Sequence, residues 1–204
     1  MTDTPLYASK RDARIDVFRG LALITIFIDH VRENFYASYT LGNFGISDAA
    51  EAFVLMSGMS AGLAYGLYFR PPMRFMVGLG RIQRRVWTIY LVHILVTVMA
   101  LAVTAAIALW FDNPAIMQRN QMTVLFVNPK QFLIGIPILT QQLDYGDILP
   151  LYLVLLMAAP LGLILAWRGP LYLLVGSALS WLVVVHFKIN LPNWSSPAGQ
   201  GNRI

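Results

Sequence analysis

Residues 14–30, with the sequence Arg-Ile-Asp-Val-Phe-Arg-Gly-Leu-Ala-Leu-Ile-Thr-Ile-Phe-Ile-Asp-His, have the pattern of a membrane helix that carries charge at both ends. The uninterrupted apolar run covers only nine residues, 20–28. A helix needs about 20 residues to cross ~30 Å of hydrocarbon. Four ionisable side chains must therefore lie at or inside the membrane edges: Asp16, Arg19, Asp29 and His30. Ionisable groups at this depth are costly and persist where they face a protein interior or a wet cavity, so we expect a functional site here.

The spacing of these groups predicts a polar face on the helix. Arg19 and His30 are about three turns apart at ~100° per residue, so they point the same way. Asp16 and Glu33 fall within roughly 60° of that line, while Asp29 lies to one side. The alternative is two interfacial charge clusters that extend to opposite headgroup layers.

The composition is that of a membrane protein. The 204 residues are 57% hydrophobic and 12% charged, whereas soluble domains carry about twice that fraction of charge. The net charge of +5 follows membrane topology rather than one binding face, so no nucleic-acid partner is expected. No cysteine is present, which excludes disulfides and thiolate catalysis.

The hydrophobic pattern predicts an all-α, polytopic transmembrane helix bundle of about five spans. The predicted spans are approximately residues 16–35, 49–69, 86–110, 148–167 and 170–187, the last two forming a tight hairpin. In this arrangement ten of the fifteen basic residues lie on the side of the N-terminus. The positive-inside rule then makes the N-terminus cytoplasmic.

Three regions follow from this topology: a cytoplasmic tail (1–13), a helical membrane domain (14–190) and an external loop (191–204). Residues 111–147 form a long outer segment. Within it, the apolar piece 132–139 contains Gly135 and Pro137 and is too short to span, so an interfacial or re-entrant segment is expected.

The second predicted span opens with Ser47-Asp48-Ala-Ala-Glu51. Ser47 before an acidic first turn fits an N-cap, and Asp48 and Glu51 favour the positive end of the helix dipole; this role at the helix start is the favoured interpretation of Asp48. Glu51 lies one turn deeper, on the same outer side as His30, where it could orient an imidazole or a substrate hydroxyl. Gly58, Gly62 and Gly66 recur every four residues and predict close helix packing.

Three arginines cluster at the start of the third span. Arg81, Arg84 and Arg85 have i, i+3, i+4 spacing and share one helical surface. Their guanidinium groups can donate paired hydrogen bonds to the phosphate oxygens of a nucleotide-like donor. The alternative is positive-inside anchoring to anionic lipid heads. For His93, two turns further along, a hydrogen bond to a neighbouring helix and a functional role remain equally open.

The order and spacing of these motifs resemble the N-terminal part of the OpgC family, within the wider membrane acyltransferase-3 group. The resemblance covers most of residues 14–160. It rests on Arg14-Ile-Asp16, Phe18-Arg19-Gly20, Asp29-His30, Ser47-Asp48-Ala-Ala-Glu51-Ala-Phe53, Leu55-Met-Ser57-Gly58, Arg84-Arg85 to Tyr90, His93, and Asp147-Ile-Leu-Pro-Leu-Tyr152.

The resemblance implies a multi-pass enzyme of the bacterial inner membrane that transfers a succinyl group from cytoplasmic succinyl-CoA to a periplasmic glucan. It implies a role for the membrane histidine, here His30, and a donor-binding role for Arg84 and Arg85. No tightly bound cofactor and no metal are expected. Family members have about twice as many spans, so we expect the chain to be an N-terminal half, completed by a missing half or a homo-oligomer.

The remaining candidate residues complete the predicted site. His30 could act as general base or as nucleophile, and the sequence does not choose between these roles. Glu33 or Glu51 is better placed than Asp29 to orient its ring. Arg81, Arg19 and His93 are further candidates for binding the acyl donor. Asp48 and Asp147 are candidates for binding the acceptor. The competing classes are a transporter or proton-coupled channel and a non-catalytic, truncated membrane protein.

Overall fold

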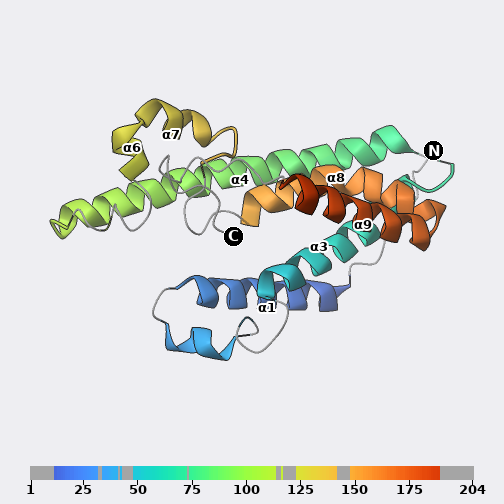
Figure 1. Ribbon diagram of the computed structural model, residues 1–204, viewed down its shortest axis with the longest axis horizontal. Coiled ribbons are helices and arrows are strands. Elements are labelled where there is room, and N and C mark those ends of the chain that lie inside the picture. Colours follow the sequence, from blue (N-terminus) through green and yellow to red (C-terminus); the bar gives the residue numbers. More distant parts are fainter. Residues whose placement is uncertain are drawn as a thin grey trace, which may run out of the picture. The chain divides into compact units, whose positions relative to one another are not determined.

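The computed structural model describes residues 12–31, 34–40, 42, 48–72, 74–113, 116, 123–141 and 148–188 (Figure 1). All regular structure in these stretches is helical, which confirms the all-α prediction. The elements are α1 (Ala13–His30), η1 (Phe35–Tyr39), α3 (Ala49–Tyr65), η2 (Gly66–Tyr68), α4 (Phe75–Trp110), α6 (Thr123–Val127), α7 (Pro129–Gly135), α8 (Ile148–Arg168) and α9 (Pro170–Phe187). The described residues fall into two compact units, one from the stretches up to Gln83 and Leu155–Leu173, the other from Arg84–Val154 and from Leu174 onward.

Four helical segments among the described residues are long and apolar enough to cross a membrane. They are Ala49–Tyr68, Phe75–Trp110, Ile148–Arg168 and Pro170–Phe187, with 20, 36, 21 and 18 residues. These segments confirm a polytopic membrane protein. The α1 helix also has 18 residues, but its charged side chains set it apart from the four apolar segments.

The first and third predicted spans have different bounds in the structure. The α1 helix ends at His30 rather than near residue 35, because the backbone of Val31 is extended (φ −80°, ψ 106°). Asn34 caps the separate helix η1 by accepting from the Tyr36 backbone N–H at 3.0 Å. The α4 helix begins at Phe75 rather than at residue 86. At ~1.5 Å per residue it is about 54 Å long and exceeds ~30 Å of hydrocarbon. Hydropathy located only its apolar part.

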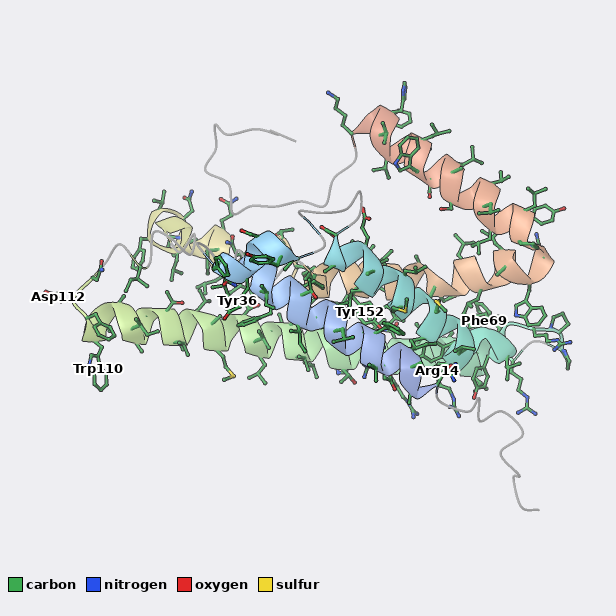
Figure 2. The ribbon with its side chains drawn as sticks, turned by 90° about the horizontal axis from the view of Figure 1, so that it is seen from below. Arg14, Tyr36, Phe69, Trp110, Asp112 and Tyr152 are labelled. Carbon is green, nitrogen blue, oxygen red and sulfur yellow. The ribbon has the colours of Figure 1, made fainter. Side chains whose placement is uncertain are left out.

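In the first unit, α1 and α3 pack against each other and bury part of its core (Figure 1). Ala22 and Ile26 of α1 are buried, as are Ala49, Phe53 and Ser57 of α3. Each set repeats every four residues and forms one stripe along its helix. In Figure 2, Arg14 at the start of α1 and Phe69 just beyond α3 lie at the same end of this pair. The two helices are therefore antiparallel.

A close helix approach occurs at Gly78 rather than at the predicted glycines. Among the described atoms, nothing lies within 4 Å of a Cβ built on Gly58 or Gly62, so the packing prediction is wrong for both. A Cβ on Gly66 would lie 4.0 Å from Leu163. A Cβ on Gly78 would lie only 2.7 Å from the Cβ of Tyr68. The periodic spacing indicated a stripe of glycines, but the neighbouring side chains decide at which position a glycine is needed.

In the second unit, α7 and the turn after it form a compact segment. The helix ends at Gly135, whose carbonyl accepts from the backbone N–H groups of Thr140 (2.9 Å) and Gln141 (3.0 Å). Phe132 and Gln141 are fully buried. The Tyr90 hydroxyl of α4 donates to the Pro137 carbonyl at 2.9 Å. The segment is too short to span a membrane, as predicted, and its interfacial or re-entrant location stays a prediction.

The turn between α8 and α9 is as tight as predicted. The α8 helix ends at Arg168 and α9 begins at Pro170, so Gly169 alone connects them. Gly169 has φ +147°, a region that L side chains rarely adopt. Proline at the first position of α9 needs no backbone N–H.

Candidate functional site

The imidazole of His30 is held at the C-terminal end of α1. Its side chain is half-buried, and Nδ1 lies 2.7 Å from the carbonyl oxygen of Ile26, one turn earlier. A carbonyl can only accept, so Nδ1 carries the proton. In the neutral ring Nε2 then bears the lone pair. This tautomer suits a general base and equally a nucleophile, so the two roles predicted for His30 both remain.

Arg19 lies on the same face of α1. Both Arg19 and His30 are half-buried and follow the stripe of Ala22 and Ile26 that packs on α3. The Arg19 guanidinium carbon is 5.5 Å from the centre of the Phe53 ring on α3, a cation–π contact. Eleven residues separate Arg19 from His30, which is roughly 16 Å along the axis. The polar face therefore runs along the α1–α3 interface, and Arg19 and His30 lie at two different heights along the helix axis.

The carboxylates predicted around His30 differ in position. Asp16 is half-buried and Asp29 is exposed, in keeping with the expectation that Asp29 lies to one side. Glu51 is exposed in the first turn of α3, and its role in orienting His30 stays a prediction. Glu33 and Asp147 lie outside the described residues, so their predicted roles have no structural account.

Asp48 caps α3. Its Oδ1 accepts from the backbone N–H groups of Ala50 (2.8 Å) and Glu51 (3.0 Å). Asp48 itself is therefore the N-cap, rather than Ser47, which lies outside the described residues, and the structural role of Asp48 at the start of the helix is confirmed. Binding of an acceptor by Asp48 stays a prediction and would have to coexist with the cap.

The three arginines of α4 are all exposed: Arg81, Arg84 and Arg85. The Arg81 guanidinium carbon lies 5.0 Å from the centre of the Tyr68 ring, within the first unit. Arg84 and Arg85 begin the second unit. Their exposure is compatible both with a phosphate-bearing donor and with lipid headgroups.

His93 is buried in the second unit, with 1% of its surface exposed. Nε2 of His93 has no hydrogen-bond partner among the described residues. The alternative in which this nitrogen bonds a neighbouring helix therefore finds no support in that part of the chain. The structural and the functional role of His93 both stay predictions.

The sequence analysis assigned no role to Ser57 or to Trp167. Ser57 is 3% exposed, and its hydroxyl has no partner among the described residues. Its spacing of four from Phe53 was a usable signal, because it predicts a shared face. Trp167 donates from Nε1 to the Gly66 carbonyl at 3.0 Å. The two residues are far apart in the sequence, so no local pattern predicts this contact.

The family of the chain follows from its whole length rather than from one motif. A family model described as OpgC protein matches residues 11–201. That family suggests a membrane acyltransferase-like role in glucan modification. No match was found among curated proteins or among solved structures. No group of three or more metal-ligating side chains is found in the described stretches. The chain belongs to the OpgC family.

Proposed function

We propose that this chain acts in the bacterial inner membrane as an O-acyltransferase that moves a succinyl group from cytoplasmic succinyl-CoA to a hydroxyl of a periplasmic glucan. The observation that carries the proposal is the His30 imidazole, held at the end of α1 by the hydrogen bond from Nδ1 to the Ile26 carbonyl, which in the neutral ring puts the lone pair on Nε2. The OpgC family match supports the reaction class.

In the general-base form, Nε2 of His30 removes the proton from the glucan hydroxyl. The oxygen attacks the thioester carbonyl, the carbon–sulfur bond breaks, and the proton passes to the departing CoA sulfur. In the nucleophilic form, Nε2 attacks the thioester carbonyl, and the carbon–sulfur bond breaks to release CoA thiolate. The hydroxyl then attacks the acyl-imidazole, the carbon–nitrogen bond breaks to restore the neutral ring, and the hydroxyl proton passes to the CoA thiolate. Both forms end with a glucan ester and free CoA.

The two substrates approach from opposite sides in this proposal. The partition of basic residues places Arg84 and Arg85 on the cytoplasmic side, where their exposed guanidinium groups suit the donor phosphates. His30 ends α1 on the outer side, and Arg19 lies three turns closer to the cytoplasm on the same face. The acyl end of the donor would pass along this face, between protein helices rather than through lipid.

A further subunit or a second copy completes the site in this proposal. The α9 helix has no buried residue and α4 is largely exposed, so both offer surface to partner helices. Lipid covers whatever part of that surface remains.

Proteoliposomes separate this function from its alternatives. The chain is reconstituted with succinyl-CoA, radiolabelled in the succinyl group, on one side and glucan on the other. Covalently labelled glucan supports the acyltransferase. Glucan or label that crosses the membrane without ester formation indicates a transporter. Neither ester formation nor transport, in liposomes or in native membranes, contradicts both functions and leaves a non-catalytic membrane protein.

A further inference from the structure

Five arginines and no acidic residue occur between Gly66 and Arg85. Two of these arginines stack on aromatic rings within the first unit. The Arg70 guanidinium carbon lies 4.8 Å from the centre of the Trp167 ring, and that of Arg81 lies 5.0 Å from the centre of the Tyr68 ring. We call these four residues the stacked-arginine site.

The two rings are themselves fixed by their surroundings. Trp167 of α8 donates from Nε1 to the Gly66 carbonyl at 3.0 Å, which joins α8 to η2. Tyr68 is 6% exposed and lies against Gly78 of α4. The stacked-arginine site therefore joins η2, α4 and α8, and its rings restrict where the guanidinium groups lie.

A guanidinium group stacked by its face keeps its N–H donors at the edge of the plane. Those donors match two oxygens of a phosphate in a fork geometry, and less freedom is lost on binding because the fork is planar and the ring contact already restricts the side chain. Both Arg70 and Arg81 are exposed, so a ligand can reach these edges. Ordinary positive-inside anchoring needs only charge and gives no role to the two rings.

We propose that the stacked-arginine site binds a phosphate ester at the cytoplasmic face. The ligand is either a phosphate of the CoA donor or the headgroup of an anionic phospholipid, since both present the same oxygens. This inference rests on the proposed function for its orientation and its donor. It adds Arg70, Tyr68 and Trp167 to the residues that recognise phosphate.

The test compares lysine and arginine at equal charge. The chain is placed in nanodiscs, and CoA binding is measured by calorimetry in phosphatidylcholine, while retention of phosphatidylglycerol is measured by mass spectrometry after purification. Arg70→Lys with Arg81→Lys should weaken one of these interactions by roughly tenfold or more, because the forked hydrogen bonds are lost. Trp167→Leu should weaken the same interaction, and Arg14→Lys is the matched control, since Arg14 is exposed and outside the site.

Weaker CoA binding with normal phosphatidylglycerol retention assigns the site to the donor, and the converse assigns it to the lipid. Lysine variants that bind both probes as tightly as the wild type, or no more weakly than the Arg14→Lys control, overturn the proposal. An unchanged elution volume on gel filtration shows that the variants are folded. If Arg70→Lys weakens CoA binding while the wild type transfers no acyl group, the proposed function fails and the phosphate site stands.

Discussion

Replacing Gly78 with alanine should destabilise the first unit, whereas the same replacement at Gly80 should stabilise it. A Cβ on Gly78 would lie 2.7 Å from the Tyr68 Cβ and 3.0 Å from the Phe69 ring. Tyr68 and Phe69 are 6% and 0% exposed, and Phe69 also meets Phe75 edge-on, so neither can withdraw easily. A Cβ on Gly80 would meet nothing within 4 Å.

The magnitudes follow from two opposing effects. Alanine in a helix interior is favoured over glycine by about 1 kcal/mol at both positions. Overpacking at Gly78 costs about 1–3 kcal/mol. The propensity gain cancels between the variants, so Gly80→Ala should exceed Gly78→Ala in free energy of unfolding by about 1–3 kcal/mol.

Thermal unfolding in detergent, followed by tryptophan fluorescence, measures this difference. For a chain of this size 1 kcal/mol corresponds to roughly 2–4 °C in Tm. Gly80→Ala should melt above the wild type and Gly78→Ala below Gly80→Ala by at least a few degrees. Equal Tm values for the two variants would refute the close approach of α4 to Tyr68.

Three further predictions concern topology, donor binding and helix capping. Because the chain has no cysteine, Lys130→Cys in spheroplasts should react with an impermeant maleimide and Gly80→Cys should not; the reverse pattern contradicts the orientation. Replacing Arg84 and Arg85 with glutamine should weaken acyl-CoA binding more than glucan binding, with lysine restoring it only partly; equal losses for both ligands indicate misfolding instead. Asp48→Ala should lower the free energy of unfolding by about 1 kcal/mol and Asp48→Asn by less, because asparagine also caps helices; equal Tm values for both would contradict the cap.

The helical class and the polar face of α1 could be predicted because both depend on local periodicity. Arg19 and His30 share a face through chain geometry alone, and the buried Ala22 and Ile26 place that face against α3. The start of α4 could not be predicted from hydropathy, since helical hydrogen bonds continue past the point where the side chains become polar. Hydropathy records where a helix is apolar and not where its backbone ends.

The stacked-arginine site depends on contacts between distant parts of the chain. The sequence indicated a basic cluster at Arg81, but the pairing of Arg70 with Trp167 requires that α8 pack beside η2. The glycine prediction was wrong at Gly58 and Gly62 for the same reason, because close packing depends on which side chains lie opposite. Local patterns find charged and small residues, and tertiary contacts decide how they are used.

Acyl transfer by a His30→Gln variant tests the central claim most directly. Succinylated glucan is quantified in native membranes, where any further subunit is present, beside the wild type and Thr25→Ala. Thr25 is the matched control, since its hydroxyl donates to the Leu21 carbonyl of the same helix at 3.0 Å. Loss of the general base should lower the rate by about 10²–10⁴-fold, with Thr25→Ala close to the wild type. Wild-type transfer by His30→Gln at normal membrane abundance would contradict the assignment of His30 as the catalytic residue.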